Sequence, residues 1–145
     1  MSTNPFVGVW KLISCDAIRR NGSVLPIYGK NPVGRLHYDA SGNMSVHIMK
    51  AGRPNFKSDT KFRATPVEMR AAYESYEAYF STYEVDEEKH IINHRVIGGI
   101  FPNWTGTIQA RHYKVEGNRL ILSTNPIGYV SEEKTIVTLV WERIN

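Results

Sequence analysis

The sequence predicts an all-β fold of about eight to ten short antiparallel strands with one short helix. Apolar and polar residues alternate over many short segments, as they do in strands that bury one face. Turn-forming residues separate these segments, and only residues 65–80 carry the start signals of a helix. Strands of this number fit either a sandwich or a closed barrel. The amino-acid composition does not distinguish a sandwich from a barrel.

The chain opens with a long alternating strand over residues 8–20, in which Trp10 faces inward and Cys15 lies on the opposite face. A turn at Asn21-Gly22 ends it. A short strand over residues 24–29 follows, and Pro26 places this strand at an edge because proline cannot donate a ladder hydrogen bond.

Residues 34–49 form the clearest hairpin. Two alternating segments flank the turn sequence ASGN. The side chains expected on one buried face are Leu36, Tyr38, Met44, Val46 and Ile48.

The helix is predicted to begin at Thr65. Thr65 is the N-cap, Pro66 takes the first helical position, and Glu68 completes a capping box. The apolar residues Met69, Tyr73, Tyr76 and Phe80 recur at helical spacing. A single helix of this length cannot cover a sheet, so we expect it to cover the opening of a barrel.

Five more strands are predicted after the helix. A hairpin near residues 79–96 places His94 on the inward face, with Ile92 and Val96. Three strands follow at residues 106–115, 119–125 and 134–143.

The strand over residues 106–115 is unusual because Gln109 and Arg111 share one face. A barrel of about eight strands can hold one small ligand, and its cavity tolerates polar groups that a packed sandwich excludes. We therefore predict a barrel in which Gln109 and Arg111 face the cavity. A buried guanidinium needs a partner, and Glu84, Asp16 or a ligand oxygen are the candidates.

Several blocks of the sequence resemble the bacterial and fungal lipocalin-like domain family. The opening Gly8-Val9-Trp10 is similar to the Gly-x-Trp signature of lipocalins. NPVGRLHYDASGNMSVHIM, FPNWTGTIQARHY and TLVWERI resemble later blocks of the family, in order. The resemblance implies an antiparallel up-and-down β-barrel that binds small, largely apolar molecules. It also implies a cation–π contact between Trp10 and Arg143 at the closed end.

We expect the ligand to meet aromatic walls and a few polar groups. Phe101 and Trp104 lie in a break before a strand, where a barrel rim would be, and Met44 is an adaptable wall contact. Arg111 and His94 are the candidate catalytic residues, as a carbonyl-polarising cation and an acid or base. The candidate ligand-binding residues are Tyr38, Met44, Tyr73, Tyr83, His94, Phe101, Trp104, Gln109 and Arg111.

Two functions are consistent with this pocket. The first is binding of a small, mostly apolar, oxygen-bearing molecule. The second is a cofactor-independent cyclase or isomerase, because the resemblance includes fungal cyclases, some of which promote hetero-Diels–Alder reactions. No metal, phosphate-binding or nucleophile motif is present, so we expect neither a metal nor a cofactor.

Length and charge limit the remaining possibilities. We expect residues 1–145 to form one domain. The net charge of +4 comes mainly from Lys50, Arg53, Lys57, Lys61 and Arg63. This segment fits a solvated loop, an attraction for an anionic ligand, or a nucleic-acid contact. No RNA- or DNA-binding motif supports the last, so we expect no nucleic-acid partner.

The N-terminus and the single cysteine bear on localisation. Residues 1–10 lack the succession of a signal peptide, and no apolar run approaches the ~18 residues of a membrane span. Cys15 is the only cysteine, as is typical of a reducing compartment. We therefore expect a cytoplasmic protein without membrane insertion. The sequence does not indicate an oligomeric state.

Overall fold

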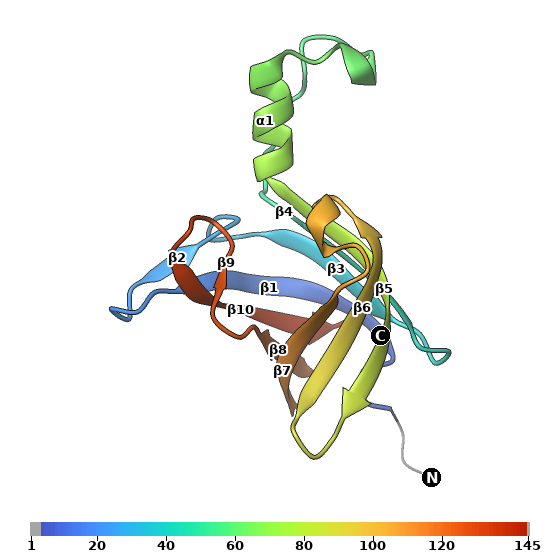
Figure 1. Cartoon of the computed structure of the whole chain (residues 1–145). Helices are drawn as coiled ribbons and strands as arrows, with labels where there is room; N and C mark the ends of the chain where they lie inside the picture. Colours follow the sequence, from blue (N-terminus) through green and yellow to red (C-terminus); the bar gives the residue numbers. More distant parts are fainter. Residues whose placement is uncertain (1–3, 145) are drawn as a thin grey trace.

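The computed structural model describes residues 4–144 as one antiparallel sheet that closes on itself (Figure 1). Eight strands form the barrel in the order β1-β3-β4-β5-β6-β7-β8-β10, and β10 pairs with β1 to close it. Two short strands, β2 and β9, pair with β1 and β10. The strands are β1 (Gly8–Ile18), β2 (Val24–Pro26), β3 (Val33–Tyr38), β4 (Asn43–Met49), β5 (Tyr76–Asp86), β6 (Ile91–Gly99), β7 (Ile108–Glu116), β8 (Arg119–Ser123), β9 (Ile127–Gly128) and β10 (Lys134–Arg143). The predicted up-and-down barrel is confirmed.

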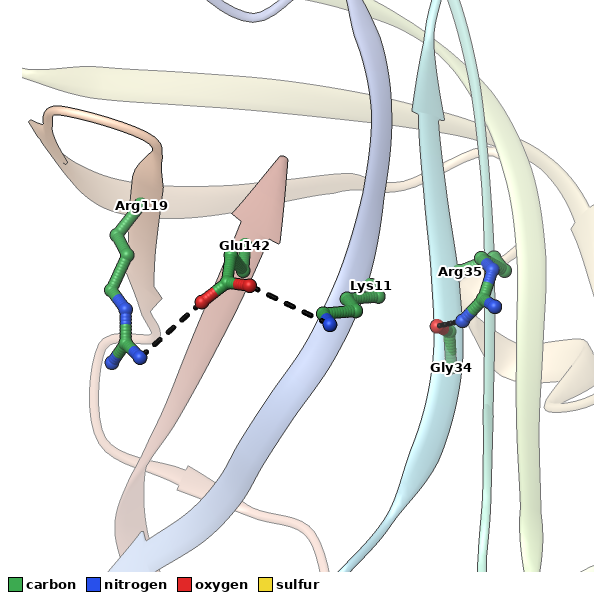
Figure 2. Close-up of polar contacts among 5 residues, drawn as sticks. All are labelled: Lys11, Gly34, Arg35, Arg119 and Glu142. Carbon is green, nitrogen blue, oxygen red and sulfur yellow. Dashed lines mark hydrogen bonds and ion pairs between the residues drawn. The ribbon is translucent and has the colours of Figure 1, made fainter. Parts of the chain in front are cut away.

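The seam between the first and last strands is reinforced on the outside of the barrel. Glu142 of β10 forms ion pairs with Lys11 of β1 at 3.5 Å and with Arg119 of β8 at 3.4 Å (Figure 2). All three side chains are partly exposed, so each pair contributes at most about 1 kcal/mol. The paired backbones and the buried inner face hold the seam together.

The strand order gives the barrel two different ends. The β3–β4, β5–β6 and β7–β8 turns lie at the same end as the start of β1 and the end of β10. The longer connections that carry β2, the helix, a 3-10 turn (η2, Pro102–Trp104) and β9 lie at the other end (Figure 1). We call the first the closed end and the second the open end.

Trp10 plugs the closed end. Its side chain is fully buried, and its indole N–H donates to the Phe6 carbonyl oxygen at 3.0 Å. The guanidinium of Arg143 lies 4.1 Å from the centre of the Trp10 ring and donates to the carbonyl oxygen of Val7. The predicted cation–π contact is therefore confirmed.

The helix α1 (Pro66–Glu74) begins as predicted but does not cover the opening. Thr65 and Glu68 form the capping box. None of its residues is buried, and Met69 and Tyr73 are each 51% exposed. Figure 1 shows α1 standing away from the barrel at the open end. Among the strands it packs mainly against β5, and its hydrogen bonds to Arg53 and Lys57 tie it to the preceding loop. The expectation of a helix across the opening is therefore wrong.

The helix is also shorter than expected, because β5 begins at Tyr76. Tyr76 and Phe80 therefore belong to a strand. The spacing from Tyr73 to Phe80 fits a helical stripe, yet Tyr76 and the residues after it pair with β4. Ladder pairing inside a closed barrel overrides the local pattern.

A bulge in β1 changes the face that Cys15 occupies. The register of β1 against β10 shifts between Leu12 and Ser14. A bulge inserts one residue, so the residues beyond it exchange faces. Cys15 is 2% exposed and faces the interior, which corrects the expected outward placement.

Candidate functional site

The barrel interior contains a cavity toward the open end. Its volume is about 50 Å³, measured as the space open to the centre of a water molecule. This space holds a few waters and is well below the roughly 300–1,000 Å³ of a typical ligand pocket. Every barrel strand contributes to the wall, whose residues are Cys15, Leu36, Met44, Val46, Ile48, Glu77, Tyr79, His94, Trp104, Arg111, Leu122, Thr124, Ile127, Tyr129, Val137, Leu139 and Trp141.

Arg111 on β7 brings a buried positive charge to the cavity wall. The side chain is 7% exposed. It donates to the Ala110 carbonyl oxygen at 3.1 Å and lies 5.8 Å from the centre of the Trp104 ring. No carboxylate of residues 4–144 lies within 4 Å of it. The partners proposed from the sequence, Glu84 and Asp16, therefore do not pair with it.

His94 on β6 is held between two tyrosine hydroxyls. Nε2 lies 2.7 Å from the hydroxyl of Tyr38, and Nδ1 lies 2.8 Å from that of Tyr79. Burial lowers the pKa of His94 well below its usual value, and the charge of Arg111 lowers it further. The imidazole is therefore neutral, with one nitrogen donating and the other accepting. Both nitrogens are occupied by protein groups.

Glu77 on β5 is a second charged group in the wall. It is 7% exposed. Its Oε1 accepts from the Ala78 N–H at 3.0 Å, and its Oε2 accepts from the Tyr129 hydroxyl at 2.7 Å. The Tyr129 oxygen lies 2.5 Å from the Tyr28 hydroxyl. Because Tyr129 donates its only proton to Glu77, Tyr28 is the donor to Tyr129.

Burial raises the pKa of Glu77, and the hydrogen bonds from Tyr129 and Ala78 and the charge of Arg111 offset only part of the increase. Arg111 is thus close enough to affect Glu77 electrostatically without contacting it. The cavity wall therefore holds a cation and an anion that are not paired with each other.

The open end is bordered by aromatic side chains from two connections. Trp104 ends η2, and Tyr129 follows β9. Their rings stack with centroids 6.1 Å apart, and Phe101 packs edge-on against Trp104. Tyr129 is tied to the sheet through Glu77 and Tyr28. A molecule larger than the present cavity enters only if this border moves.

The neutral state of His94 predicts a pH effect on stability. Below about pH 6.5 the unfolded chain binds a proton on this imidazole that the folded protein does not bind. Wild-type stability relative to His94→Gln should therefore fall with decreasing pH, by up to about 1.4 kcal/mol per pH unit. Urea unfolding of both proteins between pH 8 and pH 5 measures this difference. Parallel stability curves across the range would contradict the buried neutral imidazole.

The structure brings together only some of the residues selected from the sequence. Met44, His94, Trp104 and Arg111 line the cavity. Five others do not: Tyr38, Tyr73, Tyr83, Phe101 and Gln109. Tyr38 is hydrogen-bonded to His94, and Phe101 packs against Trp104, so each contacts a residue of the cavity wall without lining the cavity itself. Tyr83 packs against Tyr38 with ring centroids 4.8 Å apart.

Gln109 and Tyr73 lie farther from the site. Gln109 pairs across the ladder with His94 and is half-buried, but its side-chain amide donates to Thr107 at 2.9 Å. Tyr73 is on the exposed helix.

Sequence reasoning missed five wall residues that matter for the chemistry. Glu77 lay inside the segment predicted as a helix, and Tyr79 lay where that segment overlaps the predicted hairpin, although their alternation with the strand residues that follow was a usable signal. Cys15 was displaced by the bulge. Tyr129 lies in a connection without periodicity. Trp141 continues the alternation of β10, and its buried indole N–H has no hydrogen-bond partner among residues 4–144.

Within residues 4–144, no three His, Cys, Asp or Glu side chains come together to hold a metal ion. No helix in this range has the length and apolar character needed to cross a membrane.

Comparisons with known proteins agree with this architecture. A family model described as a lipocalin-like domain matches residues 7–144. The 4'-hydroxy-3'-methoxypropiophenone carrier protein ppsC of Aspergillus oryzae is 28% identical over 107 residues, which cover 70% of this chain and 96% of that protein. Since the family model covers nearly the whole chain, the protein belongs to the lipocalin-like domain family.

Proposed function

We propose that this protein binds and carries a small, mostly apolar molecule with a carbonyl oxygen inside its barrel. The observation that supports the proposal most directly is Arg111, a buried guanidinium in the cavity wall without a carboxylate partner. An unpaired buried charge is costly, and a ligand oxygen would supply the missing acceptor. The relative from Aspergillus oryzae is named as a carrier of an aryl ketone, which fits an apolar cavity with one strong donor.

The rest of the wall is consistent with this ligand class. Met44, Val46, Ile48 and the aromatic residues provide apolar contacts. The cavity has to enlarge on binding, and Met44 is flexible enough to contribute. The stacked Trp104 and Tyr129 belong to connections rather than to barrel strands, so they can move without breaking the ladder. We place this activity in the cytoplasm, since the buried free thiol of Cys15 suits a reducing compartment.

The second candidate is a cofactor-independent cyclase or isomerase that uses the same cavity. The presence of His94 in the wall favours it. However, both nitrogens of His94 are engaged by tyrosines, and its lowered pKa makes it a weak base. Binding a ligand leaves the hydrogen bonds of His94 intact, whereas proton transfer by His94 would require at least one of them to break. The site therefore fits a carrier better than an enzyme.

Replacing Arg111 with methionine tests the proposal. The probe is 4'-hydroxy-3'-methoxypropiophenone, titrated while tryptophan fluorescence is recorded, because Trp104 and Trp141 both line the cavity. A hydrogen bond to a charged group contributes about 1.5–3 kcal/mol, so Arg111→Met should weaken binding by about 10- to 100-fold.

Arg35→Met is the matched control for this experiment. Arg35 is exposed on β3 and donates to the Gly34 carbonyl oxygen (Figure 2). Its replacement should leave the affinity unchanged. Thermal unfolding confirms that both variants are folded. Equal affinity in wild type and Arg111→Met would contradict the role of Arg111, and no binding to wild type would contradict aryl ketones as the ligand class.

A further inference from the structure

We infer that Glu77 is a second ligand contact, and that it selects molecules with a free hydroxyl group in addition to the carbonyl oxygen. This inference rests on the proposed function. It assigns a role to a side chain that neither the strand pattern nor the family match indicates. The ligand predicted by this inference is a neutral molecule that carries both a ketone and a hydroxyl group.

The first argument is the number of hydrogen bonds that Glu77 can accept. A carboxylate offers about four acceptor positions. Two are occupied, by the Ala78 N–H and the Tyr129 hydroxyl. No Lys, Arg or His nitrogen of residues 4–144 lies within 4 Å of its oxygens. A side chain that lines the cavity thus retains acceptor capacity that the protein does not use.

The second argument concerns the two charges. Glu77 and Arg111 line the same cavity but do not form an ion pair. Leaving two buried charges unpaired costs free energy that an apolar pair would avoid. The barrel gains only part of the stabilisation that a contact ion pair would give, since Arg111 and the hydrogen bonds to Glu77 offset only part of the cost of burying its charge. We attribute the arrangement to a ligand that bridges the two side chains. The ligand accepts a hydrogen bond from Arg111 and donates one to Glu77.

The same two charges restrict the ligand's own charge. A cationic amine would pair with Glu77 but would be repelled by Arg111 in a cavity this small. A carboxylate would pair with Arg111 but would be repelled by Glu77. A neutral hydroxyl satisfies Glu77 in either of its protonation states, because a hydroxyl both donates and accepts.

Tyr129 and Tyr28 fix the direction of the Glu77 carboxylate. The hydroxyl chain runs from Tyr28 to Tyr129 to Glu77, with oxygen separations of 2.5 and 2.7 Å. Tyr129 comes from the open-end connection and also stacks on Trp104. The hydroxyl-recognising group is thus held by the same residue that borders the entrance.

Three ketones that differ at one position test the inference: 4'-hydroxyacetophenone, 4'-methoxyacetophenone and acetophenone. Wild type should bind the hydroxy compound about tenfold more tightly than the other two. In Glu77→Met this preference should disappear, while affinity for the methoxy compound changes less than about threefold. Glu77→Gln keeps an acceptor and should retain part of the preference. Acetophenone separates the effect of the hydroxyl from that of size.

Glu84→Met is the matched control, because Glu84 lies on the outward, exposed face of the same strand. It should keep the full preference. A wild-type protein that binds all three ketones equally, or a Glu77→Met variant that keeps the preference, would overturn the Glu77 inference and leave the proposed function standing. A wild-type protein that binds neither these three ketones nor the propiophenone probe would overturn both the Glu77 inference and the proposed function. If Glu77→Met does not fold, Glu77→Gln decides the question: a reduced preference would support the inference, and the full wild-type preference would overturn it.

Discussion

Replacing Trp10 with alanine is expected to lower the free energy of unfolding by about 3–5 kcal/mol. The side chain is fully buried at the closed end, donates to the Phe6 carbonyl oxygen and lies under the Arg143 guanidinium. Truncation removes all three contributions and leaves a cavity that the surrounding strands cannot close. Urea unfolding at pH 7, followed by far-UV circular dichroism, measures the loss.

Trp10→Phe is the control for this prediction. It keeps an aromatic ring for the Arg143 guanidinium and removes only the indole N–H and part of the buried area. Its loss should be less than half that of the alanine variant. A loss below about 1 kcal/mol in Trp10→Ala would show that the closed end is not held by this side chain.

Replacing Gly99 with alanine is the second large effect. A Cβ at this position would lie 2.7 Å from the Ala78 carbonyl oxygen and 2.7 Å from the Tyr79 Cβ. The β5 backbone must shift to admit it, and this shift moves Tyr79, whose hydroxyl lies 2.8 Å from His94. We expect a loss of about 1–3 kcal/mol, together with weaker ligand binding.

Gly98→Ala is the matched control for Gly99→Ala. Its Cβ would meet only the ring of Phe80, at 3.1 and 3.2 Å. That ring is half exposed and can move away. Alanine also restricts the unfolded chain, so the change should be nearly neutral. Equal losses in the two variants would contradict the assignment of the Gly99 effect to the close approach of β5.

Sequence patterns predicted the barrel where one periodicity dominated. The hairpin of β3 and β4 has strict alternation, and all five of its expected inward residues are buried. The inward placement of Arg111 needed a further argument, because alternation alone would favour burying the face that carries Ile108 and Ala110. The barrel cavity, which tolerates polar groups, decided between the faces, and in the structure Arg111 is buried whereas Ile108 is exposed.

The failures occurred where two patterns overlap or where no pattern exists. Residues 73–80 fit both helical and strand spacing, and only pairing with β4 and β6 decides between them. Glu77 was therefore not selected as a candidate, although it is the one acidic side chain that residues 4–144 contribute to the cavity wall. The position of Tyr129 in the cavity wall and the bulge in β1 both depend on contacts between segments that are distant in the sequence. Local periodicity carries no information about those contacts.

Closure of the sheet by its first and last strands has a consequence for synthesis. β1 is synthesised before every other strand of the barrel, and its partner β10 is synthesised after all of them. One edge of β1 therefore stays without its native neighbour until the whole barrel has been translated. Unpaired edges are where newly made β proteins associate incorrectly. Chains that stop before β10 should thus be poorly soluble and depend on chaperones.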